Sequence, residues 1–573
     1  MINYSNRVRH KSKSNQRTAV LPVFCSLLCM IFSARVYAQP QKIDTVQFNV
    51  ITNYKPVIND AVKLNDNPAP DTTKKIKREA EYNNLINSQY PTQFSPSPLD
   101  AIYMRGEPLD KLQRSYFIGG LGNYNTLYGE YFFNSLRSRN FDYGIHLNHL
   151  SSQDMQADNS YSGFAYNDVN IYGETFLPKH TLYAQADFDN QIVHDYGYNR
   201  NADVINNNDS TRVNYNKVAA AVNYKSNYKD SSEINHDLSA SYHNFTNVLN
   251  STTYRADENN VNLNAHAFTY FDDQRIDVKA SGIYYDDNDL RGNVNTWNFK
   301  FNPYFSGSGK TWDAHLGLKL FYDALNGVNL YPDFLGRYHI AHDAVMIYAG
   351  ADGDKTYNSY EMLANMNPYI EDTTDKKYTF TKIHLFGGLT GTITDNLTYN
   401  LSGAQSYIEN MPLFMTNIDE PLMNRFMVVY DNVRELDIHG DMDYKAKKDW
   451  NFILGADYYG YTPGTQQYVW YHPDFEGSLL GEYTLQKKWV LKLQAFVIGT
   501  QYAPSTELVN GVTVTNAVLD NVYPDLNIGA DYHHNSFLTV FLNLNNLANI
   551  QYQRWINYPT QGFNAMVGVR LAF

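Results

Sequence analysis

Cysteine, long apolar runs and basic residues are all scarce in this chain of 573 residues, and each shortage excludes a class of protein. The only two cysteines, Cys25 and Cys29, lie near the start, so removal of a leader would leave no disulfide and no thiolate metal site. No long apolar run follows residue 38, and the mean hydropathy is −0.49, which excludes helical membrane spans. No nucleic-acid partner is expected for a chain of net charge −13.

Residues 1–38 predict a secretory signal peptide, which would be cleaved after export through the inner membrane. Basic residues between positions 7 and 17 precede an apolar core over 19–32, and Val36-Tyr37-Ala38 fits a cleavage site. A lipoprotein signal is the alternative, but Leu28 stands before Cys29 where a small residue is required.

Residues 39–113 differ from the rest of the chain. Pro-containing runs such as Asn67-Pro68-Ala69-Pro70 and Ser95-Pro96-Ser97-Pro98 interrupt any regular element. We expect an extended segment with a short helix near 74–86, which either lies in the periplasm or fills the lumen of the domain that follows.

Aromatic residues are abundant, at 15% with 49 tyrosines, and from residue 114 apolar side chains alternate with polar ones. The pattern is clear over residues 276–282, 314–320, 489–495 and 538–544. Successive side chains of a strand point to opposite faces, so each segment has one apolar and one polar face. Tyrosine suits the two interfaces of a membrane barrel.

The connections between these segments alternate in length. Short turns are expected at 137–139, 178–179, 226–233, 272–273, 307–309, 341–342, 395–396, 446–448, 486–488 and 534–535. Longer outer loops are expected at 151–162, 191–212, 244–257, 352–377, 407–423, 461–468, 500–521 and 548–561, with 286–292 as the shortest outer loop. Residues 425–445 are predicted to be one long strand. The sequence therefore predicts an all-β fold, a transmembrane antiparallel up-and-down barrel of about 22 strands over residues 114–573, with short periplasmic turns.

The last strand ends the chain on an aromatic residue. Its apolar face is predicted to serve as the signal for the barrel-assembly machinery, because an exposed amphipathic edge can pair with another sheet edge. The residues of this signal are Phe563, Val567, Val569, Leu571 and Phe573.

The run Asn543-Leu544-Asn545-Asn546-Leu547 with Tyr552 resembles the N-L-x-N-x-x-Y element before the last loop of TonB-dependent outer-membrane receptors. That family places a plug domain of well over a hundred residues before its barrel, whereas only residues 39–113 are available here. The chain therefore resembles the plug-less, TonB-receptor-like barrels of Gram-negative, Bacteroidetes-type bacteria. Asp44-Thr45-Val46-Gln47-Phe48 is a weak match to a TonB-contacting box.

The resemblance implies a function and a set of partners. The function is solute transport or uptake across the outer membrane. The partners are outer-membrane lipid and lipopolysaccharide, the barrel-assembly machinery, and a TonB-like periplasmic protein or a plug-bearing component. A structural or adhesive surface barrel and a passive porin are the alternative functions.

Three short motifs were weighed as sites of chemistry. The run 306–311 ends like a phosphate-binding loop, but Tyr304 replaces its first glycine. The acidic run 286–292 does not fit an EF-hand register, and loose divalent binding by this outer loop is the alternative to a solvated loop. His533 and His534 point to opposite faces of a strand and cannot share one ion. The sequence therefore predicts no catalytic residue, no metal site, no cofactor and no enzyme activity.

A set of loop aromatics could stack on a sugar ring or a planar ligand, or serve in the interfacial girdle that anchors such barrels. These candidates for ligand contact are Tyr468, Trp470, Tyr471, Trp555 and Tyr558.

Overall fold

The computed structural model describes residues 112–153, 161–198, 211–228, 233–249, 253–271, 274–289, 292–341, 344–419, 422–447, 449–509, 512–520 and 522–573. The predicted signal peptide, the segment from 39 to 111 and its expected helix lie outside these residues. Among the described residues, none of the helical structure is long and apolar enough to cross a membrane.

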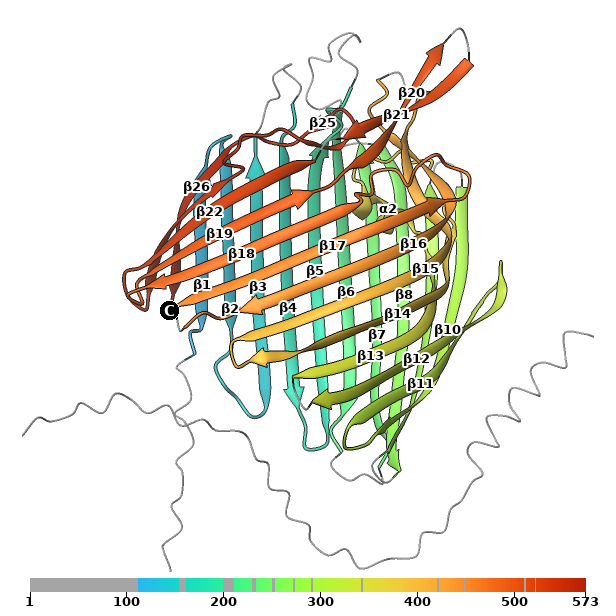
Figure 1. Ribbon diagram of the computed structural model, residues 1–573, viewed down its shortest axis with the longest axis vertical. Helices are drawn as coiled ribbons and strands as arrows, with labels where there is room; N and C mark the ends of the chain where they lie inside the picture. Colours follow the sequence, from blue (N-terminus) through green and yellow to red (C-terminus); the bar gives the residue numbers. More distant parts are fainter. Residues whose placement is uncertain are drawn as a thin grey trace, which may run out of the picture. The chain divides into compact units, whose positions relative to one another are not determined.

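The described chain forms a closed antiparallel barrel of 22 strands (Figure 1). Each barrel strand pairs with the next one along the chain, β19 pairs with β22, β23 pairs with β26, and the β1–β26 pair closes the ring. The predicted all-β, up-and-down barrel of 22 strands is therefore confirmed.

The barrel strands have the following bounds: β1 Ser115–Gly122, β2 Thr126–Asn134, β3 Phe141–Ser152, β4 Phe164–Phe176, β5 His180–His194, β6 Arg212–Ser226, β7 Asn235–Leu249, β8 Thr253–Phe271, β9 Gln274–Asp289, β10 Gly292–Ser308, β11 Trp312–Asp323, β12 Gly327–Ala341, β13 Val345–Tyr357, β14 Tyr378–Thr394, β15 Leu397–Thr416, β16 Phe426–Tyr444, β17 Trp450–Pro463, β18 Phe475–Leu485, β19 Trp489–Ile498, β22 Tyr523–His533, β23 Leu538–Asn545 and β26 Asn564–Ala572. Two hairpins lie in the connections, β20 (Gln501–Val509) with β21 (Val512–Asp520), and β24 (Gln553–Trp555) with β25 (Tyr558–Pro559). A short helix, α2 (Tyr360–Met366), lies between β13 and β14.

Alternation along the strands separates an apolar outer face from a polar inner one. Leu263 of β8 and Leu316 of β11 keep 51% and 54% of their surface exposed on the outside. Asp277 of β9 faces the interior, where it is 0% exposed and bound by His266 and Arg275 at 2.7 and 2.5 Å. So much exposed apolar surface fits lipid rather than water.

The two ends of the barrel differ. Both ends of the barrel chain lie at one end, which we call the turn end, together with short connections such as 177–179 and 395–396. The other end, the loop end, carries the long connections 358–377, 499–522 and 546–563 (Figure 1). Short turns face the periplasm in outer-membrane barrels, so the loop end is assigned to the cell exterior.

Three expected outer loops are wrong in extent. Most of 286–292 is strand, because β9 continues to Asp289 and β10 begins at Gly292. The region 244–257 is mostly strand, because β7 continues to Leu249 and β8 begins at Thr253; likewise β15 continues through most of 407–423. On the outer face of β7 and β8, Asn244 donates to Asp257 at 2.6 Å and Tyr242 donates to Asn259 at 2.8 Å. Polar side chains here mark strands that continue beyond the apolar belt. The long strand predicted over 425–445 is confirmed as β16.

The seam between β1 and β26 requires a close backbone approach. A Cβ atom at Gly568 would lie 2.2 Å from the carbonyl oxygen of Gly119 and 2.4 Å from the Phe541 ring. On the lumen side, Arg570 binds Asp531 at 2.8 Å, and Asp531 also accepts from Lys492 at 2.7 Å. These contacts join β19, β22 and β26 on one side of the closure.

Candidate functional site

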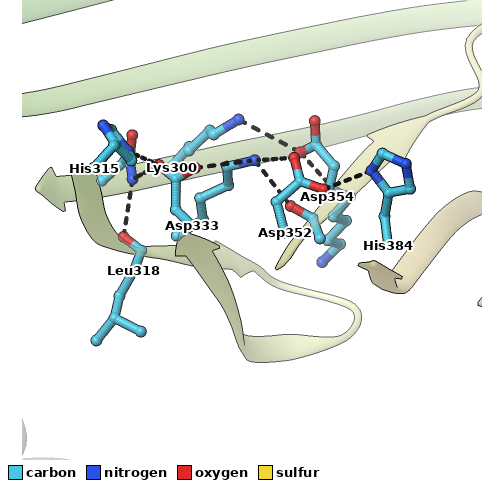
Figure 2. A network of polar contacts seen from close by, with 11 residues as sticks. Lys300, His315, Leu318, Asp333, Asp352, Asp354 and His384 are labelled. Carbon is cyan, nitrogen blue, oxygen red and sulfur yellow. Dashed lines mark hydrogen bonds and ion pairs between the residues drawn. The ribbon is translucent and has the colours of Figure 1, made fainter. Parts of the chain in front are cut away.

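A network of charged and amide side chains lines the lumen over β10 to β14 (Figure 2). Asp333 accepts from Asn302 at 2.9 Å and lies 3.0 Å from His315. Lys319 connects this group to Asp352 at 3.2 Å. The network continues from Asp352 to His384 (Figure 2), where Oδ1 and Nδ1 are 2.9 Å apart. Lys300 Nζ lies 3.4 Å from Asp354 Oδ1. Both signs of charge alternate along this wall, so it presents hydrogen-bond donors and acceptors to a polar solute.

A cavity of about 650 Å³ opens against the same wall. Its lining includes Asp237, His266, Lys279, Lys300 and Lys319. These side chains come from strands β7 to β11, and each faces the lumen. The cavity is therefore part of the barrel interior.

Aromatic and aliphatic side chains from several loops meet at the loop end in a buried cluster, which we call the loop core. The loop core consists of Val193, Val213, Tyr215, Phe245, Ala256, Tyr360, Leu363, Ala364, Ile370, Phe414, Phe426, Val428, Trp555 and Tyr558. Its members come from β5 to β8, from α2, from β15 and β16, and from the β24–β25 hairpin. The loop core thus connects strands that lie far apart around the barrel.

A buried ion-pair cluster stabilises the loop core. Arg425 binds Asp195 with two nitrogens at 2.8 Å and Asp372 at 3.2 Å, and all three residues are buried. Asp372 also accepts from Asn247 at 2.9 Å, and Asn247 donates to the Tyr360 hydroxyl at 2.6 Å. Burial opposes the charge, but the two carboxylates raise the pKa of the Arg425 guanidinium above its ordinary value. Arg425 therefore stays charged and holds two loops together.

Further hydrogen bonds join the loops to one another. Tyr196 donates to the carbonyl of Pro559 at 3.0 Å, and Tyr215 donates to the carbonyl of Pro368 at 2.8 Å. Tyr558 donates to the carbonyl of Asn424. Residues of four connections, Tyr196, Pro368, Asn424 and Pro559, thus take part in one packed structure at the loop end.

A second cavity, of about 440 Å³, lies beside the loop core. Its lining combines aromatic residues, including Tyr166, Tyr196 and Tyr552, with polar ones such as His194 and Asp525. The wall combines residues of strands, such as β4, β5 and β22, with residues of several connections, including 546–563. Rings and hydrogen-bonding groups at one cavity suit a solute that has both flat and polar surfaces.

The predicted ligand-contacting aromatics lie in two adjoining buried clusters. Trp555 and Tyr558 belong to the loop core, and the Tyr471 ring lies 4.7 Å from that of Trp555. Trp470 packs with Leu413 and Val433, and Tyr468 stacks on Tyr502 at 3.7 Å. Three of the five are nearly inaccessible, since Trp470, Trp555 and Tyr558 are 1%, 8% and 2% exposed. The structure thus brings these residues together; contact with a ligand stays a prediction.

Residues of the predicted assembly signal lie in or beside β26. The side chains of Val567 and Phe573 are 55% and 53% exposed, and Phe563 is also exposed. Between these positions Arg570 faces the lumen and binds Asp531. The arrangement matches the predicted two-faced strand, and the role in assembly stays a prediction.

The acidic run 286–292 and the histidine pair serve local structure. Asp287 and Asp289 both bind Lys376 of the loop, at 3.4 and 3.0 Å. His533 ends β22 and lies 2.8 Å from the Thr539 hydroxyl.

The loop core and its ion-pair cluster were not predicted from the sequence. The chain positions of Asp195, Asp372 and Arg425 form no motif. A charged residue next to an aromatic one, as in Arg425-Phe426, is too common to be a signal. The residues meet only because the barrel places their loops around one opening.

No protein-family model matches the sequence, and no curated protein matches it. Solved structures do match. The siderophore receptor PirA of Acinetobacter baumannii superposes with a TM-score of 0.65 at 11% identity, over 82% of this chain and 81% of that one. The chain therefore shares its barrel fold with this siderophore receptor.

Other structures agree with this comparison. The FrpB iron transporter of Neisseria meningitidis gives a TM-score of 0.64 at 11% identity, over 81% of this chain and 82% of that one. The outer-membrane ferripyoverdine receptor of Pseudomonas aeruginosa gives 0.61 at 12% identity, over 82% and 72%. At such low identities the likeness concerns the barrel fold, which the sequence predicted.

Proposed function

We propose that this chain is an outer-membrane barrel that takes part in uptake of a polar solute, with the loop core as its closed outer gate. One observation carries the proposal: a charged, cavity-bearing lumen wall lies within an apolar outer surface, beneath loops that pack against one another. A lumen lined by paired charges can hydrate and pass a polar molecule, whereas the apolar outer belt serves only the membrane. The structural neighbours are described as receptors and transporters for iron or siderophores, which supports uptake as the activity.

The finer parts of the proposal come from the resemblance to TonB-dependent receptors. We propose that the protein resembles the plug-less barrels of Bacteroidetes-type bacteria, reaches the outer membrane by a cleaved signal peptide, and uses a TonB-like protein or a plug-bearing component as its partner. Deletion of Asp44–Phe48 from the full chain tests the first partner. Co-purification of a TonB-like protein should be lost in that variant, and its retention would contradict a TonB box at this position.

Solute flux into proteoliposomes tests the gate. We expect the wild-type barrel to admit small sugars slowly, and Arg425→Met to admit them at least tenfold faster, because two buried aspartates lose their counter-ion. Lys382→Met is the matched control, since Lys382 forms a half-exposed pair with Glu409 at 3.1 Å away from the loop core.

Two outcomes would overturn the proposal. Equal, fast flux through wild type and Arg425→Met would identify a passive porin without a gate. No flux through either protein, despite correct folding, would favour a structural or adhesive barrel.

A further inference from the structure

A histidine and two glutamates from three different elements meet next to the loop core. His243 lies on β7, Glu258 on β8 and Glu361 on α2. One potential ligand atom from each of the three lies within 4.8 Å of the others, and His243 Nε2 is 2.7 Å from Glu361 Oε2. Glu258 is 1% exposed and Glu361 is 9% exposed, so both carboxylates are shielded from bulk water.

The amide of Asn260 is directed into this group. Its nitrogen lies 2.7 Å from His243 Nε2 and 2.6 Å from Glu258 Oε1. Asn260 is 2% exposed, and its Oδ1 is buried with no hydrogen-bond partner among the described atoms. A buried amide oxygen without a partner costs about 1–3 kcal/mol, which indicates that the arrangement lacks one component.

The contacts of the His243 ring point to the same conclusion. If Nε2 carries a proton, it can donate to Glu361, but it then faces the N–H of Asn260. If Nε2 is unprotonated, it accepts from Asn260, but its lone pair then faces a carboxylate oxygen. One of the two 2.7 Å contacts is therefore unfavourable in either state.

We propose that His243, Glu258 and Glu361 bind a divalent transition-metal ion, Zn²⁺ by preference, with Asn260 as a neutral fourth ligand. Imidazole nitrogen with carboxylate oxygen is a donor set that suits zinc. Four ligands at about 2.0–2.2 Å from a tetrahedral ion lie roughly 3.3 Å from one another. The His243 Nε2–Glu361 Oε2 distance of 2.7 Å is shorter than that value, and the ligand atoms of the three residues all lie within 4.8 Å of one another, so side-chain rotations complete the site. Rotation of the Asn260 amide brings its unpartnered oxygen to the ion and removes the conflict at His243.

The remaining neighbours are compatible with a cation. Lys217 Nζ binds Glu361 Oε1 at 2.7 Å and leaves Oε2 for the ion. The main-chain N–H of Glu361 donates to Glu258 Oε2 at 3.0 Å, so α2 is already held against β8. An ion bound here would connect α2 to β7 and β8 and stabilise this part of the loop core. This holds for any solute that the barrel passes.

Metal titration of the full-length protein in detergent tests the proposal, with Zn²⁺ for affinity and Co²⁺ for its visible spectrum. We expect one equivalent per chain, a Co²⁺ absorption typical of four-coordinate nitrogen and oxygen ligation, and at least tenfold weaker binding in His243→Gln and in Glu258→Gln. His266→Gln is the matched control. It removes another lumen histidine on β8, paired with Asp277 at 2.7 Å, and should bind metal as the wild type does.

A second variant separates a metal site from an ion-pair cluster. Lys217→Met removes the competing cation and keeps all four ligands, so its metal affinity should equal or exceed that of the wild type. Correct folding of each variant is checked by the heat-dependent gel mobility of the barrel. The proposal is overturned if the wild type binds no tighter than His243→Gln, or if Lys217→Met loses binding together with the ligand variants.

Discussion

The barrel wall and the loop core are both well packed, but they are stabilised over very different distances along the chain. In the wall, each strand pairs with its neighbour in sequence, and the register follows from one hairpin to the next. In the loop core, Asn247 meets Tyr360 over 113 positions, Asp195 meets Arg425 over 230, and Tyr196 meets Pro559 over 363. Local pairing makes the wall robust, while the loop core depends on a few buried polar groups that act together.

This difference predicts that the loop core can open without loss of the barrel. Four predictions test that separation, and they follow in order of decreasing effect.

The largest effect is expected from Arg425→Met, which leaves Asp195 and Asp372 buried without a counter-ion. We expect the loop core to lose about 3–5 kcal/mol of local stability. Hydrogen exchange should accelerate strongly at the amides of Leu363 and Asn367 in α2 and at its end, while exchange in the barrel strands stays unchanged. Lys382→Met should change neither region by more than about 1 kcal/mol. Loss of protection throughout the barrel would show that the two regions are not separable.

A charged side chain that faces lipid should destabilise the barrel wall rather than the loop core. Leu263→Arg places a cation in the apolar belt and should destabilise the folded barrel by about 2–4 kcal/mol in lipid vesicles. Asn264→Arg, one residue further along and facing the lumen cavity, should be tolerated. Denaturant unfolding of both variants measures the difference. Equal destabilisation would contradict the assignment of the two faces.

The barrel seam should be sensitive to a single methyl group. Gly568→Ala directs a Cβ atom at the Gly119 carbonyl and the Phe541 ring, and should cost about 1–3 kcal/mol. Gly129→Ala is the control, because a Cβ there meets nothing within 4 Å. Yields of heat-modifiable barrel should fall only for Gly568→Ala. A similar yield for both variants would mean that the seam adjusts easily.

The smallest effect concerns pH and the connection 464–474. Burial lowers the pKa of His472 below 6.5, and its Nδ1 lies 2.8 Å from the carbonyl oxygen of Trp470. The opened loop therefore binds a proton below about pH 6.5 that the packed loop excludes, so stability is complete above this pH and falls below it. We expect a loss on the order of 1 kcal/mol at pH 5.5, seen as faster exchange in this connection. His472→Asn should remove the pH dependence, and its persistence would assign the effect to another group.

The wall was largely predictable because its information is local. Alternation at Ile276, Leu316 and Leu542 identified both faces of three strands. The same rule misplaced the outer ends of β7 and β8. Polar residues such as Asn244 and Asp257 interrupt the apolar alternation, yet they still pair across strands above the lipid. Apolar alternation along a strand marks the part that faces lipid, whereas the hydrogen-bonded pairing with neighbouring strands continues beyond that part.

The loop aromatics show what residue types alone cannot predict. Trp470, Trp555 and Tyr558 stood out as large rings in polar connections, which suggested either a ligand or the membrane interface. The structure places them in buried clusters, where each covers the others. A sequence shows that such rings need partners but cannot show which loops reach one another.

By itself, the sequence determined the class of fold, a strand count of about 22 and the two faces of the clearly alternating strands, since alternation and turn residues act between neighbours. Only the tertiary structure decided which loops close the mouth, where Arg425 finds its two carboxylates, and that His243, Glu258 and Glu361 come within reach of one ion. The physical reason is ring closure: joining β1 to β26 brings together residues hundreds of positions apart, and no local pattern encodes which of them will meet.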